Sequence, residues 1–154
     1  MRRKNQRGLT LVELIVAFTI MLLLTTMAVP MARFRIRRER EKQLNYALHE
    51  MRQAINKFKD ASDARQIPPG KIDTDGYPES LEQMVEGVRP QGSPDKKLKF
   101  LRRIPKDPMT HSTDWGLRST RDDPKSTSFG GQNVFDVYTK STEKASDGTP
   151  YSEW

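Results

Sequence analysis

A long apolar run near the start of the chain, from Leu9 to Ala32, is its strongest pattern. As an α-helix, a run of this length extends roughly 36 Å at about 1.5 Å per residue, enough to cross a hydrocarbon layer about 30 Å thick. The run is apolar on every face, unlike a helix of a soluble domain. It is also longer than the apolar core of a secretory signal peptide. The pattern therefore predicts a membrane-spanning helix.

Beyond Ala32 the chain becomes charged and then amphipathic. Residues 33–42 carry six basic and two acidic side chains, and four basic residues precede the apolar run, so charge counting leaves the orientation open. Farther along, apolar side chains recur every three or four positions, as on one face of a helix. The members of this stripe are Leu44, Leu48, Met51, Ile55 and Phe58. We therefore predict that residues 33–59 continue the helix and that its stripe holds the rest of the chain.

Residues 60–154 alternate short apolar runs with turn-forming segments, which is typical of a small α+β domain. Pro68-Pro69-Gly70 marks a loop, and a short helix is expected to begin near Pro78 or Ser80 and to end at Gly87. The best strand candidates are residues 99–104 and 134–138, and a weaker one is 115–117. The predicted fold is α+β: a long N-terminal helix whose second half packs against a small antiparallel sheet.

Composition excludes several classes of function. The formal charge is +7, but removing the four basic residues of the first eight leaves 23 basic and 20 acidic side chains. No basic face with interleaved aromatic residues indicates nucleic-acid binding. The sequence has no cysteine, and its two histidines form no metal-ligand pattern. Phosphate-binding loops and nucleophile motifs are also missing, so we expect no enzyme activity.

Glu13 is the one charged residue inside the apolar run. A carboxylate costs roughly 2.5–3.5 kcal/mol at a bilayer centre and less near the interface. One interpretation is that a positive charge from another copy of the same segment neutralises it. The other is that the side chain extends toward the interface on its own.

The motif around Glu13 resembles the processing site of type IV pilin-like proteins. The residues that carry the resemblance are Gly8-Leu9-Thr10-Leu11-Val12-Glu13. It implies that a prepilin peptidase cuts between Gly8 and Leu9 and methylates the new N-terminus on Leu9, which makes Glu13 the fifth mature residue. The family usually has Phe in place of Leu9. We expect the Leu9 amine of one copy to pair with Glu13 of the next in a filament. At 4 Å such a pair attracts by about 4 kcal/mol at an effective dielectric of 20, before desolvation is subtracted.

Pro30 falls where many proteins of this class also have proline. It has no backbone N–H, and its ring clashes with the carbonyl one turn earlier. We therefore predict a helix kink at Pro30, with Thr25 and Thr26 as candidate partners for the freed carbonyls.

Three further segments resemble the G-type major pseudopilins of type II secretion. They are Asp75-Gly76-Tyr77-Pro78, residues 101–108 (Leu-Arg-Arg-Ile-Pro-Lys-Asp-Pro) and the ending with Asp136-Val137-Tyr138, Ser146-Asp147-Gly148 and Trp154.

That group usually carries a calcium loop near the C-terminus, and calcium requires six to eight oxygen ligands. Around Asp147 the acidic residues are sparse: Glu153 follows, and Asp136 and Glu143 precede. We expect no cofactor and no metal, with a weak calcium possibility at Asp147. The plain alternative is a glycine turn.

The resemblance implies a structural subunit, the major pseudopilin of a helical pseudopilus that drives export of folded proteins across the outer membrane. It divides the chain into a leader (1–8), a membrane and filament-core helix (9–32), an amphipathic continuation (33–59) and a periplasmic domain (60–154) anchored in the bacterial inner membrane. The implied partners are further copies of the chain in a homo-oligomeric filament, the prepilin peptidase, minor pseudopilins, an inner-membrane platform, an assembly ATPase and an outer-membrane secretin.

Two other functions remain open. One is a subunit of a type IV pilus or related surface filament, although the lack of cysteine favours the secretion system. The other is a single-pass anchored enzyme or binding module, in which the helix serves only as a tether.

Overall fold

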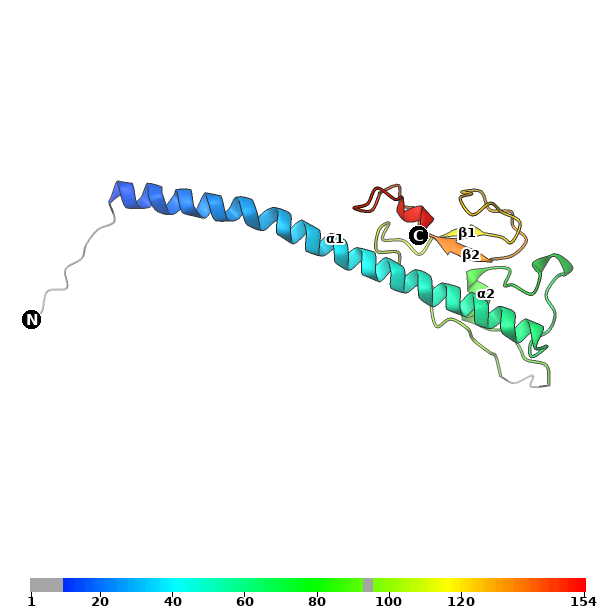
Figure 1. The fold of residues 1–154 in the computed structure, drawn as a ribbon. Coiled ribbons are helices and arrows are strands. Elements are labelled where there is room, and N and C mark those ends of the chain that lie inside the picture. The colour runs from blue at the N-terminus through cyan, green and yellow to red at the C-terminus, as the bar shows by residue number, and fades with distance from the viewer. Residues whose placement is uncertain (1–9, 93–95) are drawn as a thin grey trace, which may run out of the picture. The chain divides into compact units, whose positions relative to one another are not determined.

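The computed structural model describes residues 10–92 and 96–154, without the side chains of residues 27–30. Its elements, in order, are helix α1 (Leu11–Asp63), 3₁₀ helix η1 (Ile72–Thr74), helix α2 (Leu81–Glu86), strands β1 (Gly116–Arg118) and β2 (Asp136–Tyr138), and 3₁₀ helix η2 (Tyr151–Glu153) (Figure 1). The long N-terminal helix and the small antiparallel sheet confirm the predicted α+β fold.

Two compact units divide the chain, Met1–Glu39 and Arg40–Trp154, and α1 contributes residues to both. The second unit, called the soluble unit below, contains the core and both strands. The helix runs four residues farther than predicted, to Asp63 rather than residue 59, and the loop with Pro68 and Pro69 follows it.

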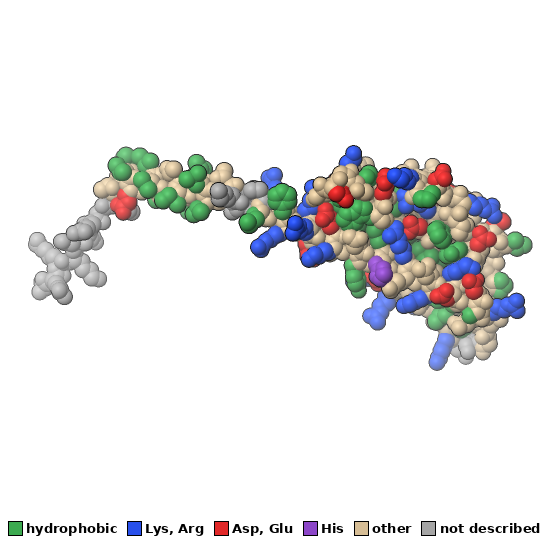
Figure 2. All heavy atoms as spheres, in the orientation of Figure 1, with side chains coloured by type: hydrophobic (Ala, Val, Ile, Leu, Met, Phe, Trp, Pro, Cys, Tyr) green, Lys and Arg blue, Asp and Glu red, His purple; other side chains and the backbone are tan. Residues whose placement is uncertain are grey.

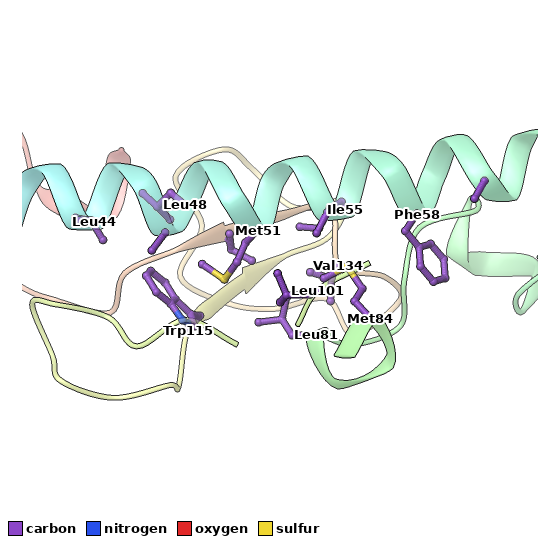
Figure 3. Close-up of a cluster of buried hydrophobic side chains, with 14 of the residues drawn as sticks. Leu44, Leu48, Met51, Ile55, Phe58, Leu81, Met84, Leu101, Trp115 and Val134 are labelled. Carbon is purple, nitrogen blue, oxygen red and sulfur yellow. The ribbon is translucent and has the colours of Figure 1, made fainter. Parts of the chain in front are cut away.

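The apolar stripe of α1 forms one wall of the core, as predicted. Leu44, Met51 and Ile55 are fully buried, and Leu48 and Phe58 nearly so. The residues that face the stripe come from α2, the loops and the segment before β2 (Figure 3): Leu81, Met84, Leu101, Trp115 and Val134. Each large apolar side chain contributes about 1.5–3 kcal/mol when it is fully buried, so this contact is the main force holding the soluble unit together.

The short helix α2 begins and ends where the sequence indicated. The Ser80 side chain accepts a hydrogen bond from the Gln83 N–H, and Gly87 ends the helix with a positive φ of 81°. The segment 99–104, expected as a strand, forms none. Two of its backbone N–H groups, those of Phe100 and Leu101, both donate to the Met84 carbonyl at 3.1 Å. Carbonyls near a helix end lack intrahelical donors, so this segment binds to α2 instead of to a strand.

The sheet consists of β1 and β2 in antiparallel register, with Gly116 opposite Tyr138 and Arg118 opposite Asp136. Strand β2 is shorter than the predicted range 134–138, and β1 lies one residue beyond the weaker candidate 115–117. Gly116 is required where it stands: a Cβ there would lie 2.2 Å from the Tyr138 ring. The ring therefore occupies the space of the missing side chain.

We predict that Gly116→Ala lowers the free energy of unfolding of the full chain by about 1–3 kcal/mol, because the methyl group displaces the Tyr138 ring. Chemical denaturation in detergent, followed by circular dichroism, measures it. In a Tyr138→Leu background the penalty should shrink. An equal penalty in both backgrounds would show that the ring is not the cause.

Candidate assembly site at the N-terminal helix

Helix α1 begins with a capped first turn. The Thr10 hydroxyl accepts a hydrogen bond from the Glu13 N–H at 3.3 Å, and the Thr10 carbonyl accepts one from the Leu14 N–H at 3.1 Å. Thr10 is therefore the N-cap, and Thr-x-x-Glu is the spacing of a capping box. Sequence reasoning missed this role of Thr10, although a threonine three residues before a glutamate signals it.

Glu13 lies in the first turn of α1, where the positive end of the helix dipole favours a carboxylate. Its side chain is exposed. Within the described ranges 10–92 and 96–154, its carboxylate has no hydrogen-bond or ion-pair partner. Gly8 and Leu9 lie outside the described residues, so cleavage and methylation there stay predictions.

The helix that follows presents apolar side chains on every side. From Thr10 to Thr26 each described residue is exposed, and the large apolar side chains among them are 46% to 77% exposed. An 18-residue window of this helix has a mean hydropathy of 2.3, and none of it is buried. A soluble monomer rarely exposes so large an apolar patch. The segment therefore needs lipid or neighbouring protein around it.

Hydroxyl groups inside this segment are already satisfied. Thr19 donates to the Ile15 carbonyl at 2.8 Å, and Thr25 donates to the Met21 carbonyl at 2.7 Å. Thr26 donates to the carbonyls of residues 22 and 23. These internal bonds remove the cost of placing a hydroxyl in hydrocarbon.

Pro30 lies within α1, which continues across it, while its side chain is outside the described part. Proline at this position leaves the Thr26 carbonyl without its helical donor. The hydroxyls of Thr25 and Thr26 donate to carbonyls of the preceding turn instead. The expectation that they bind the freed carbonyl is therefore wrong, and the kink stays a prediction.

Asp147, the weak calcium candidate, forms a turn with its own backbone. Its carboxylate accepts a hydrogen bond from the Thr149 N–H at 2.9 Å, and this bond lowers the pKa of Asp147. Gly148 takes a positive φ of 89°. Among the residues that the structure describes, no three carboxylate, imidazole or thiol groups gather closely enough to hold a metal ion.

Two of the other acidic residues named with Asp147, Asp136 and Glu153, bind basic side chains. Asp136 accepts from Arg52 Nε at 2.7 Å and lies 3.6 Å from Arg118 Nη1, while Glu153 pairs with Lys125 at 3.0 Å. These carboxylates are therefore held by cations of the chain itself. Calcium needs several carboxylate oxygens directed at one point, whereas these two carboxylates are directed at basic side chains. The expectation of no metal stays a prediction.

The two arginines around Asp136 also bind backbone carbonyls, and together they form what we call the arginine clamp (Arg52 and Arg118). Arg118, whose side chain is 6% exposed, donates to the carbonyls of Ser126 and Ser152 and stacks 4.0 Å from the Tyr138 ring centre. Arg52 donates to the carbonyls of Val137 and Trp154. Sequence reasoning missed both arginines, since Arg52 and Asp136 are 84 positions apart.

Comparison with known protein families gives a match in the N-terminal part of the chain. Residues 3–29 match the family model described as the prokaryotic N-terminal methylation motif. The match contains Gly8, Leu9 and Glu13. No curated protein and no solved structure matches the chain.

The motif indicates a type IV pilin-like protein, either a pilin or a pseudopilin. Proteins of this class are structural subunits rather than enzymes, and the motif implies processing by prepilin peptidase and assembly into a filament. With the long apolar helix, it also indicates a single-pass protein anchored in a membrane.

Calcium removal should leave the melting temperature of the full chain unchanged, because the arginine clamp already holds the C-terminal segment. Arg118→Gln should lower the free energy of unfolding by roughly 3–5 kcal/mol, since it breaks a buried charge network. Thermal and chemical denaturation with and without EDTA measure both effects.

A matched control is Arg121→Gln. This side chain is 61% exposed and lies 3.8 Å from Asp73, so its loss should cost at most about 1 kcal/mol. A wild-type protein that melts earlier after chelation would contradict the account.

Proposed function

We propose that this chain is the major pseudopilin of a type II secretion system, a structural subunit of a helical pseudopilus. The observation that carries the proposal is an exposed acid, Glu13, in the first turn of an apolar helix that the chain itself leaves uncovered. The acid stands five positions after Gly8, within the matched methylation motif.

Two properties of this helix favour assembly: its exposed apolar side chains and its carboxylate, which is unpaired within the described residues. Its apolar side chains require cover, and bundling copies of the helix supply it when a subunit leaves the bilayer. The Glu13 carboxylate requires a cation, and the free amine of a neighbour's Leu9 supplies it after cleavage. A buried carboxylate without its partner is costly, so the pair penalises wrong registers. Thr10 fixes the turn that holds Glu13.

The proline-containing segment at Tyr77, which resembles the G-type major pseudopilins, joins separate parts of the soluble unit. The Tyr77 ring meets the Phe135 ring edge-on at 5.3 Å between centroids. The Pro78 carbonyl accepts a hydrogen bond from the Val134 N–H at 2.7 Å. These two contacts hold residues 134 and 135, which precede β2, against the segment that precedes α2.

Residues 101–108 have a comparable role. Asp107 is fully buried, and its carboxylate accepts hydrogen bonds from the Met109 N–H and from the hydroxyls of Thr110 and Thr139. The Pro105 carbonyl accepts one from the indole of Trp115 at 2.8 Å. In both segments that resemble pseudopilins, the named residues therefore make contacts that stabilise the fold of the soluble unit.

In the proposed system the soluble unit lies in the periplasm and the helix is anchored in the inner membrane. A platform protein and a cytoplasmic ATPase add subunits to the base of the rod, and minor pseudopilins associate with it. Growth of the rod pushes folded proteins through an outer-membrane secretin. The subunit itself needs no active site.

Glu13→Ala should still be cleaved and inserted but should polymerise at least about tenfold less, because the register-setting charge pair is lost. Shearing or cross-linking of membranes followed by immunoblotting measures the polymer, and N-terminal sequencing checks that the mature chain starts at Leu9. Thr19→Ala, which removes a hydroxyl bonded only within the helix, is the matched control. Normal fibres from Glu13→Ala would contradict the pairing.

Deletion of the gene in the native host separates the secretion system from a surface pilus. We expect exported proteins to accumulate in the periplasm while surface filaments persist, and a plasmid copy to restore export. Fractionation and electron microscopy provide the two measurements. Loss of surface filaments with normal export would favour the pilus instead.

A further inference from the structure

A group of arginines with interleaved apolar side chains follows the apolar part of α1. Residues 33–38 contain four arginines and no acid. Phe34 and Ile36, which alternate with the arginines, are 63% and 56% exposed, and Met31, which precedes them, is 67% exposed. We call residues 31–38 the arginine belt. Figure 2 shows Lys and Arg side chains gathering on the helix beyond its hydrophobic stretch.

The distance along the helix places this belt at a defined depth. From Glu13 to Arg33 is 20 residues. At about 1.5 Å per residue, Arg33 lies roughly 30 Å and Arg38 roughly 38 Å beyond Glu13 along the axis. A bilayer has a hydrocarbon core about 30 Å thick and a total thickness of about 40–45 Å with its headgroups. With Glu13 at one boundary, the belt falls within the opposite headgroup layer.

The belt has charge on more than one side of the helix. Arg35 and Arg38, three residues apart, line an open hollow of about 470 Å³ with Met31 and Phe34. Arg33 lies about 160° away from Arg35 around the axis at 3.6 residues per turn. While the helix lies in the bilayer, a single docked protein would contact one face, whereas a headgroup layer surrounds the helix. The arrangement therefore suits a lipid surface better than a protein partner.

We propose that the arginine belt is a binding site for anionic phospholipid headgroups in the outer-facing leaflet. The guanidinium groups of Arg33, Arg35 and Arg38 are exposed and match the paired oxygens of a phosphodiester. The apolar side chains of Met31, Phe34 and Ile36 lie against the upper acyl chains. The inference rests on the membrane insertion of the proposed function, and it adds a lipid class to it.

The test compares two trace lipids in phosphatidylcholine vesicles that contain the full chain. One is spin-labelled phosphatidylglycerol, and the other is spin-labelled phosphatidylcholine. Electron paramagnetic resonance gives the fraction of each held at the protein, and hence their relative association constants. We expect the wild type to prefer phosphatidylglycerol, by up to about fivefold for each exposed arginine. The preference should weaken as salt is raised, because the contact is electrostatic.

Replacing Arg33, Arg35 and Arg38 together by Gln should bring the ratio of the two constants close to one. The matched control replaces Lys96, Lys97 and Lys99 by Gln: it removes the same charge from exposed positions of the soluble unit and should keep the preference. Equal wild-type constants, a preference insensitive to salt, a retained preference in the triple arginine variant, or equal loss in the control would each overturn the proposal.

Carbonate extraction separates this result from the proposed function. A chain that stays in the membrane and forms fibres but binds both lipids equally would overturn only the headgroup site. A chain that selects phosphatidylglycerol but never polymerises would overturn only the filament.

Discussion

Helix α1 is one continuous helix whose two parts need different environments for their apolar side chains. In its early turns the described side chains are exposed and apolar, so cover has to come from outside the chain. From Leu44 onward one stripe of the same helix is buried under α2, the loops and the segment before β2. The hydrophobic effect therefore acts on both parts, within the chain in one case and between molecules in the other. In the proposed filament, this difference makes the chain a subunit that assembles through its N-terminal helix.

In its described residues the soluble unit has little regular structure: a two-stranded sheet, the short helix α2 and two 3₁₀ helices accompany α1. An isolated pair of strands is only marginally stable in water. Stability comes instead from the stripe of α1 and from polar groups that join distant loops. Asp107 collects three donors in the interior, and Asp136 lies between Arg52 and Arg118. Guanidinium groups with several donors bind carbonyls of β2 and of the segments outside the sheet.

Local signals in the sequence were sufficient for much of the fold. Hydrophobic spacing predicted the apolar helix and the buried stripe, and Ser80 and Gly87 correctly bounded α2. The strand expected at 99–104 was wrong because its N–H groups found the end of α2, a partner that no local pattern reveals. In the candidate site Glu13 was evident from its cost in an apolar run. Thr10 was missed although its spacing from Glu13 is a readable signal.

By itself the sequence determined the features that depend on neighbours along the chain: a helix long enough to cross a bilayer, an acid within it, the processing motif and the amphipathic stripe. Only the tertiary structure decided which carbonyls Arg52 and Arg118 bind, that the Tyr138 ring fills the space above Gly116, and that Asp136 and Glu153 bind basic side chains. Helical period and capping are local and can be counted in a sequence. Contacts across dozens of positions depend on how loops close, and a single sequence carries no record of that.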